Sequence, residues 1–291
     1  MSVKPLLIIA LFVAAIGARA ETHPAAFDIK ECQTCHPDAL KQFPHTYHAK
    51  LPNSCANCHG DVAAHVKAVQ AGEGAGPIVS FKTLKPAEIN ARCLGCHDKA
   101  RQANWHGGVH ERRGLACTTC HSVHTFQSER AQLKTARESE TCFGCHPSVR
   151  AQSLRVSHHP MREGKMDCGS CHDPHDSTTP RMIKARTVNE LCYTCHTEKR
   201  GPFLWEHAPV RENCANCHQP HGSNHDKLMV ASLPFLCQRC HSSTRHPGTL
   251  YDLSATLAGP NTSNRSVEHA CRNCHQNVHG SNAPSGPYLG R

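Results

Sequence analysis

Residues 192–223 read CYTCHTEKRGPFLWEHAPVRENCANCHQPHGS and contain two C-x-x-C-H motifs. The first motif is CYTCH at 192–196 and the second is CANCH at 214–218. His207 stands seven residues before the second motif, and His221 stands three residues after that motif's own histidine. This arrangement of paired cysteines with flanking histidines is a repeating unit, and the rest of the chain can be divided by it.

The same motif accounts for every cysteine in the 291-residue chain. All 20 cysteines fall into C-x-x-C pairs, and a histidine follows each pair. The cysteines are Cys32, Cys35, Cys55, Cys58, Cys93, Cys96, Cys117, Cys120, Cys142, Cys145, Cys168, Cys171, Cys192, Cys195, Cys214, Cys217, Cys237, Cys240, Cys271 and Cys274. The histidines that follow the pairs are His36, His59, His97, His121, His146, His172, His196, His218, His241 and His275.

C-x-x-C-H is the attachment signature of c-type haem. Two thiols form thioethers to the vinyl groups of one porphyrin, and the x-x spacing lets a single turn of chain reach both. The adjacent histidine then binds the iron as the proximal ligand. The sequence therefore predicts ten covalently bound haem c groups.

Three other uses of paired cysteines fit less well. A disulfide scaffold suits a cysteine-rich exported chain, but it gives no reason for a histidine after each pair. A zinc scaffold uses C-x-x-C pairs in twos and does not require the histidine. A dithiol redox enzyme needs one such pair rather than ten.

The composition also points to a non-protein core. Without the cysteines and the apolar N-terminus, about 30% of the remaining residues are apolar, which is low for a globular domain. Only 14 residues are Phe, Trp or Tyr. Ten flat apolar haems, each fixed covalently, would supply the interior that the side chains cannot.

Sixteen histidines remain for the distal side of the irons, whereas the chain has only five methionines. Bis-histidine ligation is therefore expected at most or all sites. Position in the repeat selects ten distal ligands: His48, His65, His110, His124, His159, His175, His207, His221, His246 and His279. His45, His106 and His158 each lie beside a better-placed histidine and could substitute, whereas His23, His225 and His269 match no repeated position.

A reach argument limits the histidines that lie three residues after a motif, which are His124, His175 and His221. Three residues span at most about 10 Å. Two trans ligands of one iron need their Cα atoms on the order of 12 Å apart, given iron–nitrogen bonds near 2 Å. Each such histidine should therefore bind a neighbouring haem. For His175 the simplest neighbour is the haem of Cys142 and Cys145.

The chain resembles the periplasmic decahaem cytochromes of the MtrA/DmsE type. The resemblance lies in the 192–223 stretch, in CRNCHQNVHGSNAPSG at 271–286, and in the N-terminal half. In that half it includes CHGDVAAH (58–65), the segment from Trp105 to His110, and CTTCHSVH (117–124). It implies a chain of bis-histidine haems threaded through an outer-membrane β-barrel porin, and it supports the same ten distal positions. His106 is an extra histidine relative to the family and leaves a choice between His106 and His110.

The expected fold is a multihaem cytochrome c with little regular secondary structure, in which short helices and loops wrap around ten haems in five di-haem repeats. Residues 1–20 are expected to be a signal peptide: Lys4, an apolar run from Leu6 to Ile16, and an A-x-A site at 18–20. The apolar run is too short for a membrane anchor. Residues 21–291 form the decahaem domain.

Among the linkers, helices are expected at 61–69 and 131–145, surface loops at 71–77 and 253–266, and an extended tail from Gly280. No alternating run is long enough to predict a sheet.

The formal charge of +9 would ordinarily suggest a nucleic-acid partner. Twenty haem propionates, ten ferric centres and the loss of the signal peptide would bring the holoprotein to about −3, so nucleic acid is not expected.

The expected function is electron transfer without bond chemistry, as in anaerobic respiration or extracellular electron transfer. Six-coordinate iron has no open position for a substrate, and two imidazoles keep the potential low. The expected partners are the porin, a periplasmic or inner-membrane cytochrome, and an outer-surface cytochrome or reductase. The expected location is the periplasm, in association with the outer-membrane porin.

Two alternatives remain open. A multihaem reductase would need a five-coordinate haem, often marked by an altered motif, whereas all ten motifs here end in histidine. A free periplasmic shuttle would have no barrel partner.

Overall fold

The computed structural model describes residues 29–241, 271–284 and 286–290. The expected signal peptide, the loop at 253–266, and His23, His246 and His269 lie outside these residues. The described chain divides into two compact units, residues 1–80 and 81–291, each with its own internal contacts.

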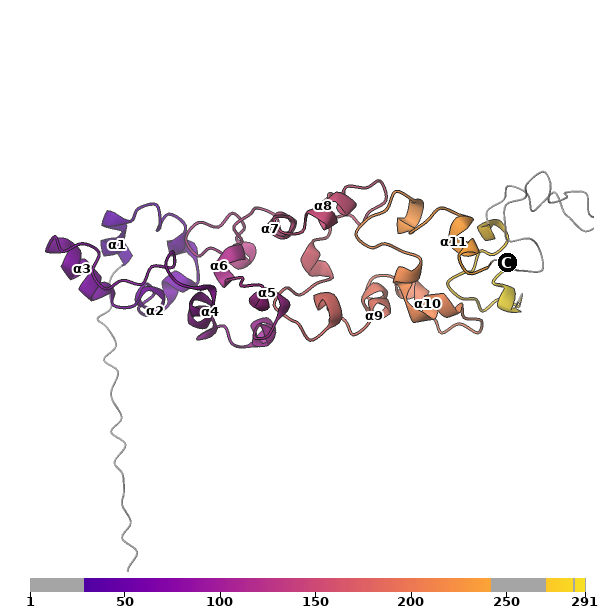
Figure 1. The fold of residues 1–291 in the computed structure, drawn as a ribbon, viewed down its shortest axis with the longest axis horizontal. Helices are drawn as coiled ribbons and strands as arrows, with labels where there is room; N and C mark the ends of the chain where they lie inside the picture. The colour runs from indigo at the N-terminus through magenta and orange to yellow at the C-terminus, as the bar shows by residue number, and fades with distance from the viewer. Residues whose placement is uncertain (1–28, 242–270, 285, 291) are drawn as a thin grey trace, which may run out of the picture. The chain divides into compact units, whose positions relative to one another are not determined.

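Short helices and loops make up both units (Figure 1). The α-helices are α1 (Ile29–Cys35), α2 (Ala56–His59), α3 (Val62–Gln70), α4 (Pro86–Leu94), α5 (Val109–Arg112), α6 (Cys117–Cys120), α7 (Glu138–Phe143), α8 (Pro147–Ser153), α9 (Val188–Tyr193), α10 (Ala208–Glu212) and α11 (Phe235–Gln238). Eleven 3-10 turns lie between and after them in the described ranges: η1 (Phe43–His45), η2 (His48–Lys50), η3 (Ala100–Asn104), η4 (Arg130–Gln132), η5 (Cys168–Ser170), η6 (Pro180–Met182), η7 (Thr197–Lys199), η8 (Cys214–Asn216), η9 (Asp226–Leu228), η11 (Cys271–Asn273) and η12 (Gly286–Tyr288). Within these residues, strand pairing is limited to isolated bridges.

In the first unit, α3 confirms the helix expected at 61–69. Asp61 caps it, because its side-chain oxygen accepts the backbone N–H of Ala64 at 2.9 Å. The residues at 71–77 are exposed, as expected of a surface loop. After this loop the chain returns to the second motif, where the N–H of Val79 donates to the carbonyl of His59 at 2.9 Å.

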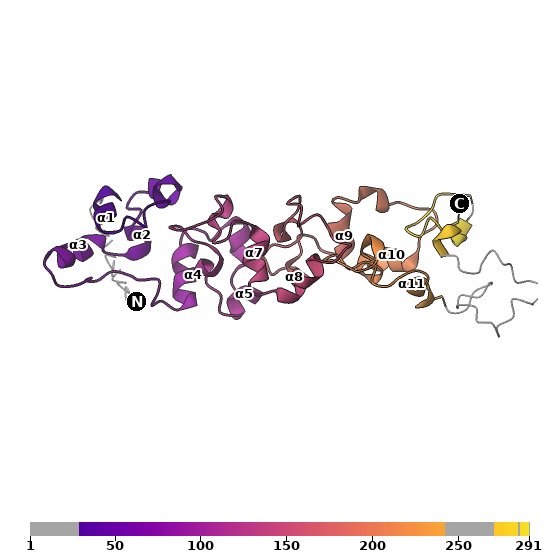
Figure 2. The same cartoon turned by 90° about the horizontal axis from the view of Figure 1, so that it is seen from above.

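In the second unit, the helices are spread along one direction from α4 at one end to α11 at the other, with α7, α8, α9 and α10 between them in chain order, as Figures 1 and 2 both show. Two buried asparagines join neighbouring motifs. Asn90 on α4 donates to the carbonyl of Leu115 at 3.0 Å and accepts the N–H of Cys117 at 2.8 Å. Asn189 on α9 makes the same pair of contacts, with Val210 at 2.9 Å and Cys214 at 2.7 Å. Each asparagine thus fixes one C-x-x-C-H motif against the next.

Two expectations about local structure were wrong. The helix expected at 131–145 does not form as one element, because Ala131 and Gln132 have left-handed φ angles of 59° and 51°. Residues with left-handed φ cannot continue an α-helix, so only α7 is helical here. The tail after Gly280 is not simply extended: Ser281 bridges to Trp205, η12 follows, and Leu289 is buried.

The described residues contain little apolar core. Nine apolar residues are buried, and no large side chain is less than 2% exposed. A chain of this length would ordinarily bury far more side-chain carbon. The scarcity fits the expectation that the core comes from a bound group.

Candidate haem sites

Every C-x-x-C-H motif forms one closed turn. In all ten motifs, which lie entirely in described residues, the N–H of the histidine donates to the carbonyl of the first cysteine at 2.9–3.1 Å. This i to i−4 bond is that of an α-helical turn. The turn holds the two sulfurs and the imidazole in a fixed relation, which three-point attachment of a haem requires.

The motifs meet in pairs through their cysteines. The first cysteines of consecutive motifs contact each other in Cys93–Cys117, Cys142–Cys168 and Cys192–Cys214. Within the second unit, the second cysteine of a pair also lies near the motif that follows, as Cys120 does with Cys145, Cys171 with Cys192 and Cys217 with Cys240. All twenty cysteines are free of disulfides. The motifs are thus arranged in pairs.

Six pairs of histidine rings lie at the spacing of two ligands on one iron. With iron–nitrogen bonds of about 2 Å, trans imidazoles place their ring centres about 6 Å apart. The structure has ring-centre distances of 5.9–6.5 Å, with five of the six pairs stacked. The pairs are His36–His65, His121–His175, His146–His110, His172–His221, His218–His279 and His241–His207. Each joins one predicted proximal histidine to one predicted distal histidine.

The pairing bears on the expected reach of His175. His175 does not share a site with His172, in agreement with the reach argument, because His172 pairs with His221. The neighbour expected for His175 was wrong, however: it faces His121, and His110 takes the place opposite His146. The physical reason is that the place opposite His146 is occupied by His110, which donates Nδ1–H to the carbonyl of Pro174 at 3.0 Å.

The proximal histidines of the even-numbered motifs are oriented by backbone carbonyls. Nδ1–H of His121, His172 and His218 donates to Ala131, Arg181 and Lys227, at 2.6, 2.9 and 2.8 Å. His59 and His275 donate similarly to Val79 and Tyr288, at 2.9 and 2.6 Å. Placing the proton on Nδ1 leaves the lone pair of Nε2 free for iron.

The accepting residues Ala131, Arg181 and Lys227 all have left-handed φ angles, between 56° and 59°. The role of these three residues was not predicted from the sequence. They lie nine or ten residues after their histidine, and that recurring spacing was the available signal.

The distal histidines are held by the loops of later motifs. His159 donates from Nδ1 to Pro220 at 2.8 Å, and His207 donates to Val278 at 3.1 Å. In the first unit His65 donates to Ala75 at 2.5 Å. The even-motif loop after His172 therefore serves three sites: His172 and His175 each face a different partner ring, and Pro174 orients His110.

Four predicted distal ligands are not placed by the six ring pairs. His159 is oriented by Pro220, as described above. His48 starts η2, His124 lies after α6, and His246 falls outside the described residues.

Burial makes the distal rings good ligands. Burial lowers the pKa of His175, His207, His221 and His279 below the ordinary histidine value. For His175, the neighbouring His121 lowers the pKa further, whereas Asp173 acts in the opposite direction. A neutral imidazole is the form that binds a metal, so these rings are prepared for iron at neutral pH.

The spare histidines have other partners. The side chain of His106 is 72% exposed, and its Nδ1 lies 2.9 Å from Oε1 of Glu111. His158 donates from Nδ1 to the carbonyl of Arg155 at 2.7 Å, and its Nε2 lies 3.2 Å from Glu163. Of His106 and His110, only His110 has a ring contact with a motif histidine in the described residues.

Two further observations fit a bound group with carboxylates. Trp105 is 7% exposed, its Nε1–H has no hydrogen-bond partner, and its ring lies 6.2 Å from that of His175. A buried donor without a partner is costly, and a haem propionate beside His175 would supply the acceptor.

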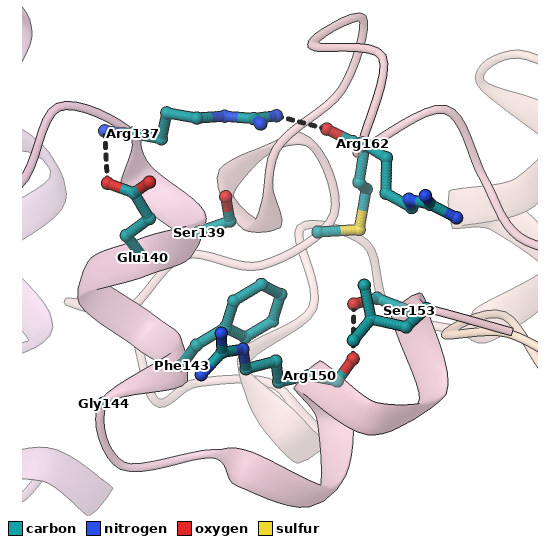
Figure 3. Close-up of a pocket in the computed structure, with 10 residues that line it drawn as sticks. Arg137, Ser139, Glu140, Phe143, Gly144, Arg150, Ser153 and Arg162 are labelled. Carbon is teal, nitrogen blue, oxygen red and sulfur yellow. Dashed lines mark hydrogen bonds between the residues drawn. The ribbon is translucent and has the colours of Figure 1, made fainter.

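The second observation is a basic cavity of about 370 Å³ beside the fifth motif (Figure 3). Arg137, Arg150 and Arg162 line it, together with Phe143 of that motif. The guanidinium of Arg137 donates to the carbonyl of Met161. Three guanidinium groups make the cavity suitable for an anion.

No helix in the described residues combines the length and hydrophobicity needed to cross a membrane.

Known proteins share this pattern. Residues 158–201 and 207–246 match the family model described as a doubled CXXCH motif, and residues 55–137 match the model of the NrfB-like cytochrome c-type protein. The chain is 40% identical to the multihaem cytochrome MtrA of Shewanella baltica over 242 residues, which is 81% of this chain and 70% of that protein. It is 32% identical to the cytochrome c-type protein NrfB of Escherichia coli O6:H1 over 131 residues, 41% of this chain and 65% of that protein.

The paired motifs and this identity establish covalently bound haem c as the cofactor. The chain belongs to the family of MtrA-type multihaem c-type cytochromes.

Proposed function

We propose that this protein carries electrons along ten bis-histidine haem c groups, between the periplasm and partners at the outer membrane or outside the cell. The observation that carries the proposal is the set of six histidine pairs, each 5.9–6.5 Å between ring centres. When bound, haem iron supplies a one-electron couple between ferrous and ferric states.

The ligand assignment follows from these pairs. His36, His121, His146, His172, His218 and His241 are proximal ligands, opposed respectively by His65, His175, His110, His221, His279 and His207. The repeat extends the assignment to His59, His97, His196 and His275 as proximal ligands and to His48, His124, His159 and His246 as distal ligands. The cysteine preceding each proximal histidine and the one three residues earlier form the thioethers.

In the proposed function, the polypeptide fixes the orientation of the imidazole rings. An Nδ1–H bond to a backbone carbonyl fixes the tautomer and orientation of one ring in each of the six pairs. Two imidazoles on one iron leave no position for a substrate, so the site transfers electrons without making or breaking bonds. The ligands change little between oxidation states, which keeps the reorganisation that accompanies transfer small.

A porin partner is the second part of the proposal. It is supported by the 40% identity to MtrA over most of the chain and by the resemblance in the segments between motifs. The protein would lie in the periplasm with one end in an outer-membrane porin. A periplasmic or inner-membrane cytochrome would exchange electrons at one end, and an outer-surface cytochrome or reductase at the other.

Reconstitution tests the conduit. The holoprotein and the porin encoded nearest its gene are inserted together into phospholipid vesicles that enclose an oxidised viologen dye, and dithionite is added outside. The dye should be reduced when both proteins are present and stay oxidised with either alone. Failure of the two proteins to form a complex would leave a free periplasmic shuttle as the better account.

Spectroscopy separates the proposal from the reductase alternative. All ferric haems should give low-spin bis-imidazole signals in electron paramagnetic resonance. A high-spin signal of one haem equivalent in intact protein would indicate an open coordination site and favour a reductase.

A further inference from the structure

Asp173 occupies a special place beside one proposed iron ligand. It lies in the loop His172-Asp173-Pro174-His175, and its side chain is only 13% exposed. Its Oδ1 accepts the backbone N–H of His175 at 3.1 Å and lies 3.6 Å from Nδ1 of the same residue. The carboxylate is thus fixed against the ring that faces His121.

The next even motif offers a matched comparison. In His218-Gln219-Pro220-His221, Gln219 stands where Asp173 stands, and both loops have the same backbone bonds. The N–H of Asp173 donates to Met182 at 2.8 Å, and that of Gln219 donates to Leu228 at 2.7 Å. An arginine approaches each side chain: Arg101 lies 3.8 Å from Asp173, and Arg155 donates to Gln219 at 3.4 Å. The two loops differ mainly in one charge.

We propose that Asp173 is a positioning and tuning residue that lowers the reduction potential of the haem attached at Cys117 and Cys120. The inference rests on the proposed ligand pair His121–His175. A ferric bis-imidazole haem carries one positive charge more than the ferrous form, so a nearby fixed negative charge stabilises the ferric state. At 3.6 Å the carboxylate makes no hydrogen bond to Nδ1 of His175, so its effect on the haem is electrostatic.

Arg101 limits this effect. Its Nε faces the other carboxylate oxygen, Oδ2, and its side chain is 67% exposed. An exposed guanidinium is screened by solvent, so it offsets only part of the charge that the less exposed carboxylate presents to His175. Removing Arg101 should therefore lower the potential of the same haem.

The test is a spectroelectrochemical titration of the full-length holoprotein and its Asp173→Asn variant. The reduction potential of one haem equivalent of the ten should rise. We expect a change of roughly tenfold in the ferric-to-ferrous equilibrium of that haem, which corresponds to about 59 mV for a one-electron couple. The variant should keep its haem number, its low-spin spectrum and its lack of carbon monoxide binding.

Reciprocal variants sharpen the test. Gln219→Asp should lower the potential of one haem equivalent, that of Cys168 and Cys171, where His221 faces His172. Arg101→Gln should lower the potential of the Asp173 haem, which is the direction opposite to that of Asp173→Asn. Opposite shifts are not expected of a merely structural contact, because the loss of either partner would break that contact in the same way.

Three results would overturn the inference: unchanged potentials in Asp173→Asn, a downward shift, or a haem that gains carbon monoxide binding, which would make Asp173 a structural support. The assignment of His121 and His175 to one iron is tested separately by the His175→Ala variant. If that variant opens the haem of Cys117 and Cys120 while Asp173→Asn changes nothing, only the role of Asp173 is refuted. If His175→Ala leaves every haem six-coordinate, the ligand assignment itself falls.

Discussion

The position of the imidazole proton determines which ring nitrogen of a histidine can bind iron. In all six ring pairs, Nδ1–H of one ring donates to a backbone carbonyl at 2.5–3.1 Å. The bonded ring is the proximal one in the even motifs, as with His121, and the distal one in the odd motifs, as with His110. Each of these six pairs therefore has one imidazole whose tautomer is fixed, with Nε2 left for iron.

His175→Ala tests the ring pairing at this scale. The haem of Cys117 and Cys120 should lose its sixth ligand, because His175 faces His121 at 5.9 Å. In the reduced variant this one haem should bind carbon monoxide, and its potential should rise, since the lost imidazole stabilised the ferric state. Carbon monoxide difference spectra provide the measurement. His158→Ala is the matched control, because His158 bonds to Arg155 and Glu163, and it should bind none.

His110→Ala and His106→Ala form a second residue-scale pair. His110 faces His146 at 6.5 Å, whereas His106 is exposed against Glu111. We expect the first variant to open the haem of Cys142 and Cys145 and the second to leave all haems low-spin. Resonance Raman spin-state markers report this directly. An open haem in His106→Ala would reverse the assignment.

At the scale of elements, short turns position the histidine side chains. The left-handed turns η4, η6 and η9 each present a carbonyl to a proximal histidine. Asn90 and Asn189 then connect the helix of an odd motif to the backbone of the next motif. These contacts are local, because each joins residues of one di-motif unit.

Asn189→Ala should weaken one such connection. Its amide donates to Val210 and Arg211 and its oxygen accepts from Cys214, all in a part-buried position. The loss of three bonds that leaves backbone groups unpaired should cost about 1–3 kcal/mol of the free energy of unfolding. Urea denaturation followed by Soret circular dichroism measures it. Glu190→Gln is the control on the same helix, and an equal loss of stability there would contradict the role of Asn189.

The sequence predicted the motifs well and the connections poorly, for a physical reason. Ten identical spacings mark the attachment turns, and the absence of a large apolar core followed from composition. The left-handed turn at Ala131 carries no glycine to mark it, so residues 131–145 looked helical. The partner of His175 depends on which loop Pro174 contacts in three dimensions, and spacing along the chain does not reveal that.

At the scale of the whole molecule, the proposed ligands of one iron come from distant segments. His218 pairs with His279, 61 residues later, and His172 pairs with His221, 49 residues later. Each haem is attached covalently within one motif, but the proposed distal ligands mostly come from a different di-motif unit. The proposed haem chain is therefore interlocked. Removing residues at one end should change the ligation of a haem that is attached elsewhere in the chain.

The haem number is the simplest whole-molecule prediction. The mass of the protein should exceed that of its polypeptide by ten haems, because all ten motifs form the same closed turn. Intact-protein mass spectrometry measures this. A mass with fewer haems would show that at least one motif is not used.

Truncation after Ala270 tests the interlocking. The shortened protein loses the motif at Cys271 and Cys274, so it should carry nine haems. It also loses His279, the partner of His218, and Val278, whose carbonyl orients His207. The haem of Cys214 and Cys217 should therefore become five-coordinate and bind one equivalent of carbon monoxide, although its own motif is untouched. The haem of Cys237 and Cys240 should keep His207 but hold it less firmly. If each motif carried its ligands locally, the same truncation would leave nine six-coordinate haems, and the spectra of truncated and full-length protein would differ only in total haem.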